Sequence, residues 1–189
     1  EFRLGNAVEE GDANMMGAPY NRIGLRECLE VARNHDHYKS TVAERAGRGV
    51  AMGYWINAGL QSSATVNVSS DGHVAVLTGS PDIGGSRASM ALMASEVLGI
   101  PFEHIHPQVA ATDSVGHTDV TGGSRTTVAT GQAVIQAAEQ CVTEMCRRAA
   151  AEWGVEVGLV AWSQGAAHYG EQTLTFHELA SRAGTMGGP

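Results

Sequence analysis

Aromatic residues, cysteines and basic residues are all scarce in this sequence, and it has no long apolar run. Only 5% of its residues are aromatic, and its three cysteines include no CxxC pair. Such a set cannot hold an iron–sulfur cluster or a four-ligand zinc ion, so we expect Cys28, Cys141 and Cys146 to be small buried side chains in a reducing, cytoplasmic setting. No segment approaches the ~20 apolar residues of a membrane-spanning helix. No secretory signal pattern opens the sequence.

The charge balance is acidic. The sequence has 12 lysines and arginines against 20 aspartates and glutamates, a formal net charge of −8. A chain of this charge repels phosphate backbones and anionic lipid headgroups at long range, which excludes nucleic acid and membrane surfaces as expected partners. The hydrophobic fraction of 43% fits a globular protein. The 24 glycines lie scattered among apolar segments, which predicts many tight turns and close backbone approaches.

We predict two parts in the chain. Residues 1–45 are expected to form an N-terminal helical segment and connector that continues an upstream element, with a first helix ending before Gly11 and a second helix over 24–34. Residues 46–189 are expected to form part of one α+β domain that is truncated at its C-terminal end. An internal fragment of this kind exposes apolar surface at its truncated edges, which predicts self-association or poor solubility.

Alternating apolar residues and glycine-containing turns predict the elements of the larger part. Val50, Met52, Tyr54 and Ile56 alternate as in a strand. Asp71-Gly72 between two alternating runs predicts a hairpin with a type I′ turn. The remaining strands are expected at 103–109, 155–162, 166–169 and 172–175, and the helices over 86–98, from Ser124 to Gly154 and from Phe176. Because these elements lack a regular βαβ rhythm, we predict the α+β class, a mixed β-sheet with helices layered on it.

One pattern occurs twice, before each of the two long helices. The runs are DIGGSR from Asp82 to Arg87 and DVTGGSR from Asp119 to Arg125. Each places a serine at or near the helix N-cap, where free backbone N–H groups and the helix dipole favour an anion such as phosphate. The adjacent glycines allow close approach of a ligand, and the arginine adds a fork of donors. The alternative is that each run is only a well-capped turn whose aspartate neutralises its arginine. Neither run fits a Walker A or GxGxxG pattern.

The other polar and aromatic groups carry weaker predictions. Two pairs of histidines lack a third ligand at a recognisable spacing, so no metal site is expected. Three polar side chains of the second loop could bind a ligand or only solvate the loop, and the three tryptophans are expected in the core or in a subunit contact. These groups are His35 with His37 and His104 with His106; Asp113, His117 and Asp119; and Trp55, Trp153 and Trp162.

Several segments together resemble one known family. They are GRGVAMG from Gly47, Asp71-Gly72 with the valines that follow, TGSPDIG from Thr78, ASEVLGIP from Ala94 and TGGSRTTVATGQAV from Thr121, with EFRLGNA and RIGL nearer the start. This combination resembles the molybdopterin-binding large subunit of the xanthine dehydrogenase and aldehyde oxidase family of molybdenum hydroxylases. The resemblance covers nearly the whole chain and implies an internal fragment of such a subunit.

The resemblance implies a molybdenum-dependent oxidoreductase that inserts water-derived oxygen into a C–H bond of an aldehyde or N-heterocycle. It implies a molybdopterin cofactor with molybdenum, often present as the cytosine dinucleotide. The implied partners are the remainder of the large subunit, iron–sulfur and FAD subunits, and a small-molecule substrate. By position, the resemblance implies that the cofactor is held by two groups of residues, Gly84, Gly85 and Ser86, and Gly123, Ser124, Arg125 and Thr126, which would offer backbone N–H and hydroxyl donors.

The sequence departs from the family pattern at three points. Many members have Gly-Gln-Gly where this chain has Gly84-Gly85-Ser86. The Gly-Gly-Phe-Gly-Gly loop is expected upstream of Glu1, and the general-base glutamate downstream of Pro189. We therefore assign no catalytic and no metal-ligating residue, and expect the fragment alone to be inactive. The alternative, which Gly85 favours, is a non-catalytic binding or assembly domain that retains the scaffold.

Overall fold

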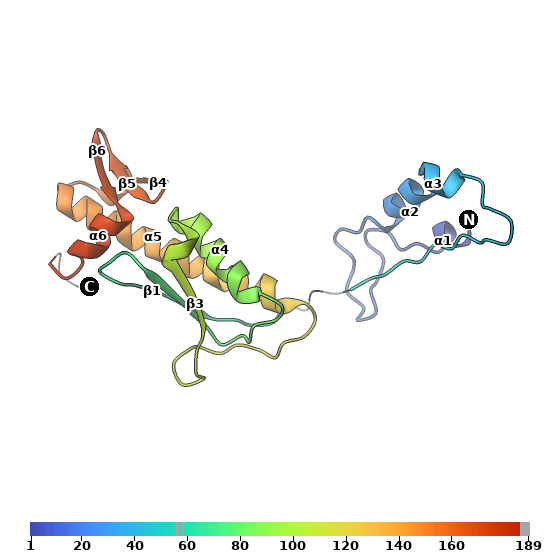
Figure 1. The fold of residues 1–189 in the computed structure, drawn as a ribbon, viewed down its shortest axis with the longest axis horizontal. Helices are drawn as coiled ribbons and strands as arrows, with labels where there is room; N and C mark the ends of the chain where they lie inside the picture. Colours follow the sequence, from blue (N-terminus) through green and yellow to red (C-terminus); the bar gives the residue numbers. More distant parts are fainter. Residues whose placement is uncertain (56, 58, 186–189) are drawn as a thin grey trace. The chain divides into compact units, whose positions relative to one another are not determined.

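The computed structural model describes residues 1–55, 57 and 59–185. The chain divides into two compact units, Glu1–Gly53 and Tyr54–Pro189. Figure 1 shows the helices and strands of each unit. Within the described residues, no helix combines the length and the apolar character needed to cross a membrane.

The first unit contains three helices, α1 (Phe2–Gly5), α2 (Leu25–Asn34) and α3 (Asp36–Lys39). Helix α2 confirms the prediction for 24–34 and buries Leu29. The first helix is shorter than predicted, because the chain turns after Gly5 into a loop closed by the backbone bridge Ala13↔Pro19. The strand predicted from Val50 to Ile56 is wrong for residues 50–55, and Ile56 lies outside the described residues. Residues 50–55 span the boundary between the two units, and no strand of the described residues pairs with them.

The first sheet of the second unit is mixed, as predicted. Strand β1 (Ala64–Val68) pairs antiparallel with β2 (Val74–Thr78), which pairs parallel with β3 (Ile105–Val109). The hairpin is confirmed, but its turn is not type I′, because Gly72 has a positive φ of 81° and Asp71 does not. The loop holds three residues between Ser69 and His73, whose N–H···O bond measures 2.9 Å. A loop of this length needs only one left-handed position, which the glycine supplies.

Two long helices pack against this sheet (Figure 1). Helix α4 (Ser86–Leu98) ends at Gly99, and α5 (Gly131–Trp153) ends at Gly154, as predicted, and both glycines are left-handed. The core is built from apolar residues of the sheet and both helices: Val74, Val76, Met90, Ala91, Ala94, Leu98, Val134 and Ala138. The helices approach each other closely at Gly131, where an added Cβ would lie 2.5 Å from the Sδ atom of Met93. This proximity places the start of α5 against the middle of α4.

A second sheet follows α5. It contains β4 (Ala161–Ser163), β5 (Ala166–Tyr169) and β6 (Gln172–Thr175), all antiparallel, and leads into α6 (Phe176–Arg182). The strand predicted over 155–162 is shorter, since Val157–Leu159 form a 3-10 turn. Trp162 packs edge-on against Phe176 and donates its Nε1–H to the Leu98 carbonyl at 3.2 Å, which ties this sheet to α4. The α+β class with helices layered on a mixed sheet is confirmed, with a second sheet that the sequence did not separate.

Candidate functional site

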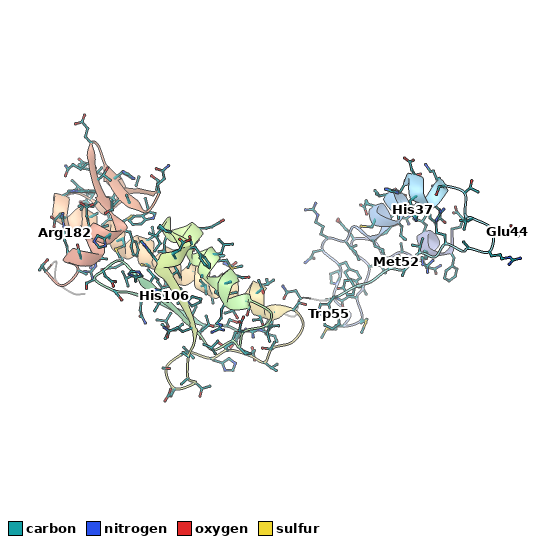
Figure 2. The ribbon with its side chains drawn as sticks, in the orientation of Figure 1. His37, Glu44, Met52, Trp55, His106 and Arg182 are labelled. Atoms are coloured by element: carbon teal, nitrogen blue, oxygen red, sulfur yellow. The ribbon has the colours of Figure 1, made fainter. Side chains whose placement is uncertain are left out.

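The loops that precede the two long helices meet at one cavity. The cavity measures about 550 Å³ and is lined by Trp55, Ile83 and residues 121–127. Ile83 belongs to the first Gly-Gly-Ser-Arg loop, and 121–127 contain the second. One residue of the first loop, Ile83, thus lines the same cavity as the second loop. Trp55, labelled in Figure 2, is 73% exposed and is not part of the core.

The first loop is closed by its own side chains. Gly85, with a φ of 93°, is the N-cap of α4, and Ser86, the first residue of the helix, lies next to it as predicted but makes no capping hydrogen bond. The Ser86 hydroxyl accepts a hydrogen bond from the Ile83 N–H at 2.9 Å and donates to the Asp82 carboxylate at 3.1 Å. Asp82 also accepts from the Arg87 backbone N–H and from Arg87 Nε, both at 3.1 Å. The Arg87 backbone N–H is the main cause that lowers the pKa of Asp82, and Arg87 is neutralised by this aspartate, as the alternative in the sequence analysis proposed.

The second loop enters its helix through an unusual turn. Ser124 has a left-handed φ of 54°, and the N-cap is Arg125, which makes no side-chain capping bond. Residues Thr126–Thr130 then form a π-helix before α5 begins. The π-helix is rare in proteins, and where it occurs it often lies at a functional site. Ser124 therefore lies next to the N-cap, as predicted, but does not itself occupy it. The left-handed Ser124 directs the chain so that the next side chain, Arg125, faces the interior.

Arg125 is fully buried and binds three separate stretches of the chain. Its Nη1 donates to the carbonyls of Asp119 at 2.7 Å and Val120 at 3.4 Å. Its Nη2 donates to the Gln61 carbonyl at 3.1 Å, to the Ser62 hydroxyl, and to the Thr130 hydroxyl at 3.4 Å. Its Nε is buried and has no hydrogen-bond partner among the described residues. The two terminal nitrogens, which were expected to bind a ligand, thus hold the loop together. The prediction that Arg125 donates a hydrogen bond to a cofactor remains only for Nε.

A buried polar network surrounds this arginine. The Thr130 hydroxyl lies 2.8 Å from the Ser80 hydroxyl and 3.1 Å from the Ser62 hydroxyl. Asp119 accepts from the Gln61 backbone N–H at 2.7 Å, which is the main cause that lowers the pKa of Asp119, followed by its hydrogen bond with His117 at 3.3 Å. Sequence reasoning missed Gln61, Ser62, Ser80 and Thr130. No local signal identifies them, because the side-chain bonds of Thr130 to Ser62 and Ser80 join residues 68 and 50 positions apart.

Two residues that line the cavity each carry a buried side-chain atom without a hydrogen-bond partner. The Thr126 hydroxyl and Arg125 Nε are buried and have no hydrogen-bond partner in the described chain, and both residues line the cavity. Buried polar groups are nearly always bonded, so such atoms mark a place where a ligand can supply the missing partner. A Cβ added at Gly84, Gly85 or Gly122 would meet nothing within 4 Å, which leaves the backbone open to close approach there. Of the predicted residues, Gly123, Ser124, Arg125 and Thr126 line the cavity, whereas Gly84, Gly85 and Ser86 are not among its lining residues.

Other groups singled out in the sequence fall elsewhere. His73 lies between His104 and His106, with ring centroids 5.0 and 5.4 Å away. In the part of the chain that the structure describes, no three His, Cys, Asp or Glu residues are placed so that they could hold a metal ion. Cys28 is exposed, so the prediction of a buried side chain is wrong for this residue. Cys146 is buried, and burial raises the pKa of the partly buried Cys141 to about 11.

Comparison with known proteins gives consistent matches. The model of the molybdopterin cofactor-binding domain matches residues 25–189. The chain is 31% identical to a xanthine dehydrogenase of Drosophila pseudoobscura pseudoobscura over 152 residues, which cover 71% of this chain and 11% of that protein. It is 28% identical to an aldehyde oxidoreductase molybdenum-binding subunit of Escherichia coli (strain K12), covering 96% of this chain and 25% of that protein.

A solved structure gives the same result. The CO dehydrogenase from Oligotropha carboxidovorans matches with a TM-score of 0.61 and 26% identity, over 66% of this chain and 16% of that one. The chain therefore spans between 11% and 25% of the length of these relatives.

Proposed function

Because this chain belongs to the molybdopterin cofactor-binding domain family, we propose that it forms part of the cradle that holds a molybdopterin cofactor in a molybdenum hydroxylase. In this proposal the full protein is an oxidoreductase of the xanthine dehydrogenase and aldehyde oxidase type, acting on aldehydes or N-heterocycles. The observation that carries the proposal is the cavity at the second Gly-Gly-Ser-Arg loop, with the buried, unpartnered Thr126 hydroxyl in its wall.

The residues at the cavity fit such a cofactor. Molybdopterin carries phosphate and a flat, hydrogen-bonding ring system. A site for it needs hydrogen-bond donors that have no partner within the chain. The backbone around Gly122 and Gly123 supplies N–H groups at a helix start. The Thr126 hydroxyl and Arg125 Nε are donors without a partner. None of the lining residues is acidic, although the chain carries a net charge of −8. An anion therefore meets no carboxylate among the lining residues.

Each loop has its own part in this proposal. When bound, the cofactor supplies oxidative hydroxylation, in which water-derived oxygen enters a C–H bond of the substrate. Gly123, Ser124 and Thr126 bind its polar groups, and Gly84, Gly85 and Ser86 close the neighbouring loop. Arg125 mainly supports the loop, because its terminal nitrogens donate hydrogen bonds to the carbonyls of Asp119, Val120 and Gln61. The chain contributes binding and orientation rather than a catalytic group.

The partners follow from the same proposal. The remainder of the large subunit completes the site, iron–sulfur and FAD subunits accept the electrons, and the substrate is a small molecule. One observation favours the second candidate, a binding or assembly domain without catalysis: the Arg87 and Arg125 side chains are both engaged within the chain. The two candidates differ in whether the protein retains the cofactor.

The test is cofactor retention by the full large subunit that contains this chain, produced in a host that makes molybdopterin, because the remainder of the subunit completes the site. We expect molybdenum and pterin to copurify with the chain, measured by elemental analysis and by pterin fluorescence after oxidation. Thr126→Val removes the unpartnered hydroxyl with little change in shape, and should reduce pterin affinity roughly three- to tenfold while leaving the melting temperature unchanged.

Thr118→Val is the matched control. Its hydroxyl is also buried without a partner, but Thr118 is not among the cavity-lining residues. It should change neither cofactor content nor stability. A full subunit that carries no pterin or molybdenum would contradict the cradle, and equal losses in both variants would contradict the role of Thr126.

A further inference from the structure

The cavity at the second Gly-Gly-Ser-Arg loop has an apolar part as well as a polar part. The apolar part consists of two large side chains, Trp55 and Ile83, and the remaining lining residues are glycines, hydroxyl-bearing residues and Arg125. Both apolar side chains are more than half exposed, at 73% and 54%. Covering exposed apolar surface is favourable. A ligand that fills the cavity therefore meets an apolar surface and hydrogen-bond donors at the same time.

Trp55 differs from the other two tryptophans in what its ring contacts. Trp153 stacks on Tyr169, with ring centroids 6.3 Å apart, and Trp162 packs edge-on against Phe176. Among the residues that the structure describes, the Trp55 side chain has neither an aromatic ring nor a hydrogen-bond acceptor as its partner. An indole is flat and offers a large π surface, on which another planar ring stacks with an offset. The Trp55 ring is thus available to a planar ligand at the cavity.

The first Gly-Gly-Ser-Arg loop holds Ile83 at the cavity. The Ile83 N–H donates to the Ser86 hydroxyl at 2.9 Å, and this hydroxyl donates to the Asp82 carboxylate at 3.1 Å. Asp82 in turn accepts hydrogen bonds from the backbone N–H and the Nε of Arg87. These bonds fix the backbone of the residue whose side chain lines the cavity. The first loop therefore contributes an apolar contact to the site, although its own polar groups bond to one another.

The polar part of the wall favours an anion. Gly122 and Gly123 lie at a helix start, where backbone N–H groups and the helix dipole attract negative charge. Arg125 is fully buried, and its hydrogen-bond acceptors are neutral carbonyl and hydroxyl oxygens. A buried charge is stabilised by an opposite charge nearby. The Thr126 hydroxyl has no partner among the described residues. The two parts of the wall together suit a planar ring that carries an anionic group.

We propose that Trp55 stacks on the pterin ring of the cofactor, that Ile83 packs against the same ring, and that the second loop binds the phosphate. This inference rests on the proposed function and adds to it the orientation of the cofactor in the cavity. The pterin is a planar heterocycle and the phosphate is an anion, so each group meets the part of the wall that matches its chemistry. The cavity, at about 550 Å³, lies within the size range of small-molecule sites. Trp55 then selects a planar ligand over a non-planar one.

The first test needs no substitution. The full large subunit is produced in hosts with and without molybdopterin synthesis, and the oxidation of each tryptophan by hydroxyl radicals is measured by mass spectrometry. We expect Trp55 to be oxidised in the unloaded subunit and to lose this reactivity in the loaded one. Trp162 is the internal control, because its ring packs within the chain, and its oxidation should be the same in both states. Equal oxidation of Trp55 in the two states overturns the proposal, and protection in both would show that another part of the subunit covers the ring.

The second test compares two substitutions in the full subunit. Trp55→Ala removes the ring and should reduce the affinity for the pterin about tenfold or more, as expected for the loss of a stacked aromatic side chain. Trp55→Phe, the matched control, keeps a planar ring and should reduce the affinity by no more than about threefold. Because Trp55 is exposed and lies outside the core, neither substitution should lower the melting temperature. The pterin retained after dialysis, measured by fluorescence after oxidation, gives the result.

The outcomes separate this inference from the proposed function. A loaded subunit whose pterin affinity is unchanged by Trp55→Ala overturns the inference alone. An increase in KM for an N-heterocyclic substrate, with the pterin content of Trp55→Ala unchanged, also overturns it, because Trp55 would then contact the substrate. A parent subunit that carries no pterin contradicts both the inference and the proposed function.

Discussion

Gln61 and Asp119 hold each other by two hydrogen bonds across 58 positions of sequence. The Gln61 N–H donates to the Asp119 carboxylate at 2.7 Å, and the Asp119 N–H donates to the Gln61 carbonyl at 3.0 Å. Arg125 then donates to both of their carbonyls. The segment before β1 is thus fastened to the second Gly-Gly-Ser-Arg loop, and this fastening determines which side of the loop lines the cavity.

Loss of the buried arginine should be costly. Arg125→Gln leaves the carbonyls of Asp119 and Gln61 buried with fewer donors, and we expect a decrease of about 2–4 kcal/mol in the free energy of unfolding. Arg87→Gln is the control, because its pair with Asp82 is half exposed and should contribute little to stability. Urea denaturation measures both. Equal effects of the two substitutions would contradict the clamp role of Arg125.

Acid should weaken the fastening of the second loop. The pKa of Asp119 lies below its ordinary value of 3.8 in the folded chain, mainly because the Gln61 N–H donates to the carboxylate. A group with a lowered folded pKa stabilises the fold above its unfolded pKa, and this contribution is lost as the pH falls through the folded value. We therefore expect Asp119→Asn to be less stable than the parent near neutral pH, and the difference to shrink below about pH 4. Chemical denaturation across this range checks it, and a difference independent of pH would rule out the charged carboxylate as its origin.

Gly99 should not accept a side chain. Its φ is 71°, and an added Cβ would lie 2.3 Å from the backbone nitrogen of Gly165. Gly99→Ala therefore combines left-handed strain with a backbone clash, and should cost about 3 kcal/mol or more. Gly154→Ala has nearly the same conformation, φ 66°, with nothing within 4 Å of its Cβ, and should cost only about 1–2 kcal/mol. The difference in stability between the two variants, measured by thermal unfolding, gives the cost of the clash with Gly165 apart from the cost of the left-handed conformation. A similar loss for both would show that the close approach to Gly165 relaxes easily.

Local patterns predicted most of the elements because their causes are local. Helix α4 and its glycine stop, the β1–β2 hairpin and the short strands of the second sheet all follow from periodicity and turn residues. These patterns failed where a predicted strand had no partner strand, or where a residue adopted a left-handed backbone conformation. The alternating residues from Val50 have no partner strand among the described residues. The N-cap of α4 is the left-handed Gly85 rather than Ser86, and Ser124 is itself left-handed and precedes the N-cap Arg125.

The sequence by itself determined the repeated Gly-Gly-Ser-Arg loops, their places before two long helices, and the likeness to molybdenum hydroxylases. Only the tertiary structure decided what the loops do with their arginines. Arg87 turns to its own Asp82, whereas Arg125 turns inward to Gln61, Ser62 and Thr130. The two loops read alike because their residues are alike. They differ in space because the direction of a buried side chain depends on carbonyls and hydroxyls that the fold brings from distant parts of the chain.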